Sequence, residues 1–207
     1  MSKDMVDERT KSRKLLSQFS HLICLDLEFT CWENSVQGDW SDPKFPAEIL
    51  QVGMVGFDLI QGQCLNKFSA YVQPIINPRM SDYCVNLLQI SQDIIDNSPA
   101  LPEVINQISG FVSDYRDDST LVCAYGPDCK KFADDAARHD RESPFRPFAC
   151  LDLAQEAGKV LGRTIKLPER EHVKQHFQLS PSSNRHDALD DALDVKILFD
   201  ALMGQSI

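Results

Sequence analysis

Apolar runs separated by short polar interruptions divide the first third of the chain into strands. The segment 21–29 (HLICLDLEF) is apolar except at two internal positions, which is typical of a buried strand. Segments 47–59 and 64–74 have the same strand-like composition and are separated by a Gln-Gly-Gln turn at 61–63. Three successive strands with such short or irregular connections predict an antiparallel meander.

The remainder of the chain follows a helical period. Apolar residues three and four positions apart predict helices at 81–90, 101–116, 151–162, 170–179 and 187–203. A further helix begins near Pro127, directly after a predicted strand at 120–126. This order of elements indicates one α/β domain over residues 19–207, preceded by a flexible N-terminal segment at 1–18.

Composition and charge narrow the class of protein. The net charge is −10 and the pI about 4.9, so few phosphates can be neutralised, which argues against a protein that wraps a long duplex. Seven scattered cysteines without a CxxC pair indicate reduced thiols. The charged N-terminus lacks the apolar region of a signal peptide, and no apolar run has membrane-spanning length. We therefore expect a cytoplasmic protein that does not enter a membrane.

Two carboxylates interrupt the first apolar strand. Because side chains alternate between the faces of a strand, Asp26 and Glu28 point to the same side. Two buried like charges this close require protons or a cation, and Mg²⁺ or Mn²⁺ prefers oxygen ligands. A strand with one face in solvent would show the same pair, so these two residues alone do not identify a metal site.

The segment NRHDALDDALD (184–194) is a second candidate for chemistry. His186 stands at the start of the last predicted helix and Asp191 follows five positions later, with small Ala188 and Ala192 leaving space for ions and a phosphate. Histidine accepts a proton from water at neutral pH, as a general base must. Acidic residues are favoured at any helix N-terminus, but that preference does not explain the histidine.

Taken together, these motifs resemble those of a known family. Asp26-x-Glu28, a later Asp at the end of a strand, and His186-x4-Asp191 are similar to the motif set of the DEDD-type 3′–5′ exonucleases with a histidine base. The resemblance implies a ribonuclease-H-like mixed sheet, in which the antiparallel three-strand meander adjoins parallel strands and helices flank the sheet.

The resemblance covers about residues 20–203 and is most specific to one branch of the family. The branch that trims the 3′ ends of histone messenger RNA and small interfering RNA is similar in the stretches LDLEFTCWE (25–33), FPAEILQVG (45–53) and PRMSDYCVNLLQIS (78–91). One departure is that a Thr-Gly pair of this branch is replaced by Leu88 and Gln89.

The resemblance implies two-metal hydrolysis of phosphodiesters. The ligands of two Mg²⁺ or Mn²⁺ ions would be Asp26, Glu28, Asp128 and Asp191. With His186 as general base, the enzyme would release nucleoside 5′-monophosphates from the 3′ ends of single-stranded or short RNA or DNA.

Contacts to the terminal nucleotide are also implied. By resemblance they come from Leu27, Phe29, Thr30, Leu87 and Ile90. In addition, Trp32 and Trp40 lie in the polar loop 30–46, where aromatic rings can stack on bases. The alternative is that both rings pack back against the domain.

The segment after Gly126 can be aligned with the third acidic motif of the family in two ways. In the resembling branch a Gly, two further residues and the catalytic Asp follow the strand, whereas only Pro127 separates Gly126 from Asp128. A gapless alignment would place Cys129 at this position, and a thiolate favours soft metals. A one-residue deletion places Asp128 there and puts Phe132 on a core-facing helical stripe, so we favour Asp128.

Two alternatives to an active exonuclease follow from the same residues. One is a catalytically weak or inactive exonuclease-fold protein that binds nucleic acid or acts as a scaffold. The other is a different metal phosphoesterase, because paired carboxylates serve many phosphoryl-transfer reactions. The presence of all four candidate carboxylates and the histidine favours the exonuclease.

Overall fold

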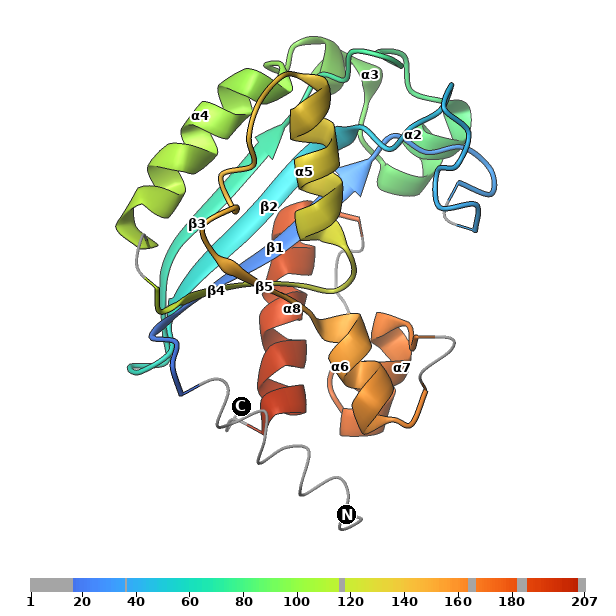
Figure 1. Cartoon of the computed structure of the whole chain (residues 1–207). Helices are drawn as coiled ribbons and strands as arrows, with labels where there is room; N and C mark the ends of the chain where they lie inside the picture. Colours follow the sequence, from blue (N-terminus) through green and yellow to red (C-terminus); the bar gives the residue numbers. More distant parts are fainter. Residues whose placement is uncertain (1–16, 36, 116–117, 164–166, 182–185, 205–207) are drawn as a thin grey trace.

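A five-stranded mixed sheet forms the centre of the molecule (Figure 1). The computed structural model describes residues 17–35, 37–115, 118–163, 167–181 and 186–204. The strands, in the sheet order β3-β2-β1-β4-β5, are β3 (Gln63–Tyr71), β2 (Ile49–Asp58), β1 (His21–Phe29), β4 (Thr120–Ala124) and β5 (Ala149–Asp152). β1, β2 and β3 form an antiparallel meander, and β4 runs parallel to β1 and to β5. The predicted mixed sheet is confirmed.

Helices cover both faces of this sheet (Figure 1). The helical segments are α2 (Asp82–Leu88), α3 (Gln92–Asp96), α4 (Leu101–Val112), η1 (Ser113–Tyr115), α5 (Asp128–Arg138), α6 (Leu153–Val160), α7 (Arg170–Phe177) and α8 (Ala188–Met203). Apolar side chains of α4 and α5 form one core with the sheet, and those of α6, α7 and α8 form another on the opposite face.

Successive side chains of β1 point to opposite faces of the sheet and so pack into different cores. Ile23, Leu25 and Leu27 pack beneath α4 and α5. Leu22 and Cys24 pack against the helices of the opposite face. Because Asp26 and Glu28 continue this second series, both carboxylates belong to the face that α8 covers.

The structure differs from the predicted elements in two places. The predicted helix 151–162 starts two residues later, since Leu151 and Asp152 end the edge strand β5. This strand has only four residues, and none of its side chains is buried. Its sequence therefore shows no alternation of buried and exposed positions that could predict it. It forms by pairing with β4, which is distant in the sequence. The short helix α3 was not predicted. Of the flexible segment expected at 1–18, all but the last two residues lie outside the described part of the chain.

Candidate active site

Three carboxylates meet where β1 passes beneath the first turns of α8. Asp26, Glu28 and Asp191 each place a ligand oxygen within 4.8 Å of the others. All three side chains are buried, Asp26 at 1% exposure. Two of these residues are adjacent on one strand face, while the third comes from a helix some 160 residues later. The fold therefore assembles the acidic group that the sequence predicts from two separate motifs.

Gln51 fixes the start of α8 against the sheet. It lies on β2 directly opposite Glu28. Its side-chain amide accepts a hydrogen bond from the Ala188 backbone N–H (3.2 Å) and donates one to the Asp187 carboxylate (3.2 Å). Asp187 in turn caps α8 by accepting from the N–H groups of its first turn. These contacts place Asp191, one turn further on, above the carboxylates of β1.

Asp128 lies at the start of α5 and approaches the same group from the end of β4. The backbone turns at Gly126 (φ 130°), whose N–H donates to the Asp152 carboxylate (3.0 Å). The Asp128 side chain is buried, and its charge contributes to raising the pKa of Asp26. Asp128 is not among the three residues whose oxygens lie within 4.8 Å of one another.

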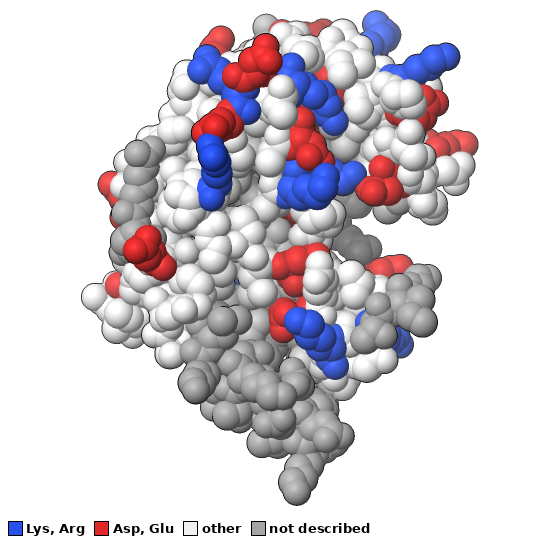
Figure 2. Space-filling view, in the orientation of Figure 1, with Lys and Arg blue, Asp and Glu red and all other residues white. Residues whose placement is uncertain are grey.

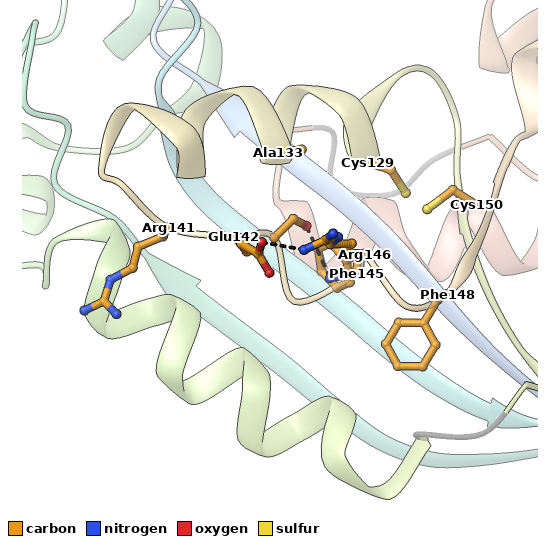
Figure 3. A pocket seen from close by; sticks show the side chains of 9 residues that line it. Cys129, Ala133, Arg141, Glu142, Phe145, Arg146, Phe148 and Cys150 are labelled. Carbon is orange, nitrogen blue, oxygen red and sulfur yellow. Dashed lines mark hydrogen bonds and ion pairs between the residues drawn. The ribbon is translucent and has the colours of Figure 1, made fainter.

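The neighbouring thiol of Cys129 points elsewhere. It faces Cys150 of β5 at a hollow of about 300 Å³ (Figure 3). Phe145 and Phe148 also line this hollow, which is separate from the acidic group. On the other side of the helix start, Phe132 is fully buried in the core, as the one-residue deletion predicts.

Burial makes the acidic group costly in its charged form. Removal from water is the largest cause that raises each pKa: to about 8 for Glu28, to about 7 for Asp128, and above the usual value for Asp26 and Asp191. Mutual repulsion adds to this effect. A group of buried carboxylate oxygens that resists ionisation suits a hard divalent cation such as Mg²⁺ or Mn²⁺, because the cation stabilises the deprotonated form.

A cationic side chain that the sequence analysis did not single out enters the group. Arg170, the first residue of α7, forms ion pairs with Asp26 and, at 3.2 Å, with Asp191. Its charge is the largest influence that opposes the rise of the Asp26 pKa. No local sequence signal marks this residue, since it is one of several charged residues in the segment 169–174.

His186 lies immediately before the cap of α8. Its backbone has a positive φ of 67°, and its N–H points to the Asp191 carboxylate at 3.4 Å. The side chain is half-buried. The chain therefore brings His186 next to one of the candidate metal ligands, and the preceding residues 182–185 lie outside the described part of the structure.

Leu27 and Ile90, two of the expected substrate contacts, are core residues. Leu27 packs beneath α4 and α5, on the face of the sheet opposite to Asp26. Only its backbone therefore remains available for the expected contact. Ile90 is buried in a separate cluster with Leu50 and Cys84, and Leu87 packs at the edge of that cluster.

The remaining candidates lie at the end of β1 and in the following loop. The Thr30 hydroxyl donates to the Pro46 carbonyl and accepts from the Glu48 N–H, both at 3.0 Å. Trp32 packs against Phe45 at a ring distance of 4.7 Å and lines a hollow of about 270 Å³.

The rings of Trp40 and Phe29 pack on each other, 5.9 Å apart, and the Trp40 indole N–H donates to the Thr30 carbonyl at 2.7 Å. Both tryptophans line the same hollow. Trp40 is held back against the domain by its indole hydrogen bond, whereas no such bond is found for the Trp32 ring among the described residues.

Comparison with known proteins agrees with this architecture. The model of the exonuclease family matches residues 23–199. The 3′-5′ exonuclease Snipper of Drosophila melanogaster is 34% identical over 96 residues, which is 46% of this chain and 33% of that protein. The probable 3′-5′ exonuclease KapD of Bacillus subtilis is 27% identical over 179 residues, 86% of this chain and 82% of that protein.

A solved structure has the same fold. The nuclease domain of 3′hExo, described as a DEDDh family member bound to rAMP, superposes with a TM-score of 0.75 at 21% identity, covering 90% of this chain and 92% of that domain. The chain belongs to the exonuclease family. Within that family, its resemblance to the DEDD-type 3′–5′ exonucleases with a histidine base is confirmed. The match spans a third or less of the length of the zebrafish, fission yeast and fly relatives.

Proposed function

We propose that this protein is a metal-dependent 3′–5′ exonuclease that releases nucleoside 5′-monophosphates from single-stranded or short RNA or DNA. The observation that carries this proposal is the buried group of Asp26, Glu28 and Asp191. The effect of Asp128 on the pKa of Asp26 and the contact of the His186 N–H with Asp191 support it. Membership of the exonuclease family supports the same reaction.

Two Mg²⁺ or Mn²⁺ ions would be held by Asp26, Glu28, Asp128 and Asp191. When bound, such ions polarise the scissile phosphodiester and neutralise charge on the leaving 3′ oxygen. His186 accepts a proton from the water that attacks phosphorus, and the bond between phosphorus and the 3′ oxygen breaks. The products are a nucleoside 5′-monophosphate and a nucleic acid shortened by one nucleotide with a new 3′ hydroxyl.

The charge distribution supports a short substrate. Basic side chains of α5 are engaged within the protein: Lys130 pairs with Asp134, and Lys131 pairs with Asp39. On the face shown in Figure 2, Lys and Arg alternate with Asp and Glu and do not form one continuous basic surface. Few phosphates can therefore be neutralised at once, which favours single-stranded or short ends over long duplexes. Trp32, at its open hollow, is the ring we propose to stack on a base.

Cleavage of end-labelled single strands tests the proposal. With Mg²⁺ or Mn²⁺, 5′-labelled RNA and DNA should shorten progressively, and 3′-labelled strands should release a labelled 5′-monophosphate at once. Asp26→Asn should abolish both, with the fold unchanged by circular dichroism. Full activity in excess EDTA, or products ending in 3′ phosphates, would exclude this mechanism.

A second candidate function rests on Arg170. A cation that already pairs with Asp26 and Asp191 favours a catalytically weak or inactive protein that retains the exonuclease fold and binds nucleic acid. Binding of single strands without cleavage at any tested Mg²⁺ or Mn²⁺ concentration would support it.

The location in the cell is a further proposal. Among the described residues, no helix is both long and apolar enough to cross a bilayer. The odd number of scattered cysteines supports a reducing, cytosolic location.

A further inference from the structure

Arg170 is held in the acidic group by contacts on several sides. One guanidinium nitrogen pairs with Asp26 and the other with Asp191, at 3.2 Å. Only 24% of the side chain is exposed, although arginine is among the residues most often found in solvent. The fork of the guanidinium thus bridges the strand β1 and the helix α8, two elements that contribute to the candidate metal site.

The backbone around Arg170 is fixed independently of the carboxylates. Tyr125, which follows β4, places its ring 5.8 Å from the guanidinium carbon. Its hydroxyl donates a 2.5 Å hydrogen bond to the carbonyl of Pro168, two residues before Arg170. Since Pro168 is itself buried, the start of α7 is anchored at the mouth of the acidic group. The arginine is therefore directed into the group by the fold and is not a flexible surface side chain that reaches it by chance.

The carboxylates that Arg170 contacts are two of those that a divalent cation would need. Arg170 pairs with Oδ1 of Asp26 and Oδ1 of Asp191, and both residues belong to the group whose oxygens lie within 4.8 Å of one another. A cation bound among these oxygens would lie next to the guanidinium, and repulsion between two positive charges is strong where water is excluded. One guanidinium also cannot neutralise four buried carboxylates, so attraction for a metal ion remains.

From this geometry we propose that Arg170 is an internal counter-ion of the metal site. In the metal-free protein it holds Asp26 and Asp191 together, and the first divalent cation must displace it from them. This inference rests on the proposed metal-dependent function. Arg170 thus competes with the metal ion for Asp26 and Asp191, and this competition sets the metal concentration at which the site fills.

The expected change in metal affinity follows from the hydrogen-bonded ion pairs of Arg170 that the metal ion must replace. Hydrogen bonds to charged groups have a net worth that corresponds to a change of about 10- to 100-fold in an equilibrium constant. Replacing Arg170 by the similarly long but uncharged methionine should therefore tighten Mg²⁺ or Mn²⁺ binding by about that factor. In the absence of metal, the same variant should be less stable, because the buried carboxylates lose their counter-ion.

The experiment compares purified Arg170→Met with the unchanged protein and with Arg146→Met. Arg146 makes an exposed ion pair with Glu142 beside the hollow of Cys129, so this control makes the same substitution and charge change away from the acidic group. Isothermal titration with Mn²⁺ gives the affinity, and thermal unfolding in EDTA and in saturating Mn²⁺ gives the stability. Arg170→Met should bind Mn²⁺ more tightly, melt lower in EDTA and gain more from Mn²⁺, whereas Arg146→Met should match the unchanged protein.

A second substitution keeps the test informative if Arg170→Met folds poorly. Arg170→Lys retains the charge but loses the fork that bridges two carboxylates. Its Mn²⁺ affinity should therefore lie between that of the unchanged protein and that of Arg170→Met. Equal Mn²⁺ affinity in all folded variants would overturn the role of Arg170 and leave the metal site intact. If no variant bound Mn²⁺ or Mg²⁺, the proposed metal-dependent function would fail, and this inference with it.

Discussion

Gly53 of β2 lies directly against the backbone of Ala188 at the start of α8. A Cβ added to Gly53 would stand 2.0 Å from the Ala188 carbonyl oxygen, closer than any real contact. Gly53 is also the residue paired with Asp26 across the β1–β2 register. The missing side chain thus allows α8 to approach the sheet at the level of the carboxylates, so that Asp191 reaches Asp26 and Glu28.

Gly53→Ala should therefore disrupt both stability and the acidic group. The added methyl meets backbone atoms that no rotamer change can move, so we expect a loss of roughly 3 kcal/mol or more in the free energy of unfolding and weaker metal binding. Urea denaturation and Mn²⁺ titration measure the two effects.

Gly110→Ala is the matched control, because a Cβ at this position of α4 meets nothing within 4 Å. Alanine there should be neutral or stabilise by up to about 1 kcal/mol. If Gly53→Ala behaved like Gly110→Ala, the close approach of α8 would not matter for the site.

Asp128 and Cys129 can be separated by substitution. Asp128→Asn should abolish Mg²⁺-dependent cleavage, because a buried carboxylate that faces the acidic group is replaced by a neutral amide of the same shape. Cys129→Ser should leave cleavage near normal, because this thiol faces Cys150. Cleavage rates of a labelled single strand at saturating Mg²⁺ measure both. The opposite pattern would assign the third acidic position to Cys129.

His186→Ala tests the general base. Loss of the base should reduce the cleavage rate by about 10²–10⁴-fold, while Mn²⁺ affinity changes little, since the carboxylates remain. Single-turnover rates between pH 6 and 9, together with Mn²⁺ titration, provide the measurement. A variant with unchanged rates across that range would show that His186 has a structural role only.

The stability of the metal-free protein should depend on pH through the buried carboxylates. Burial raises the pKa of Glu28 to about 8 from its usual 4.5, and that of Asp128 to about 7 from 3.8. Between about pH 4 and pH 8 the folded state consequently binds more protons than the unfolded state, so the free energy of unfolding falls as pH rises.

Thermal unfolding in EDTA at several pH values measures this dependence. Glu28→Gln should flatten it, because the amide does not titrate, and saturating Mg²⁺ should oppose the loss at high pH. A melting temperature in EDTA that rises steadily from pH 5 to pH 8 would contradict the assignment.

Local periodicity determined those parts of the fold and site that depend on neighbours in the sequence. The apolar run at 21–29 predicts β1, and Asp26 and Glu28 lie on one face of it because side chains of a strand alternate by geometry alone. The helical period of 187–203 likewise predicts α8 within one residue and places Asp191 one turn after the cap residue Asp187. The meander of three strands follows from equally local signals.

Tertiary structure decided the relations between distant segments. The orientation of Cys129 toward Cys150 depends on β5, an edge strand that is stabilised by pairing with β4 and has no periodicity of its own. The entry of Arg170 among the carboxylates depends on how α7 is anchored to Tyr125. Sequence patterns report which face of an element is buried, but they do not contain the distance between two charges on different elements. That distance arises only when the elements pack, and here packing brings a guanidinium to two of the three clustered carboxylates.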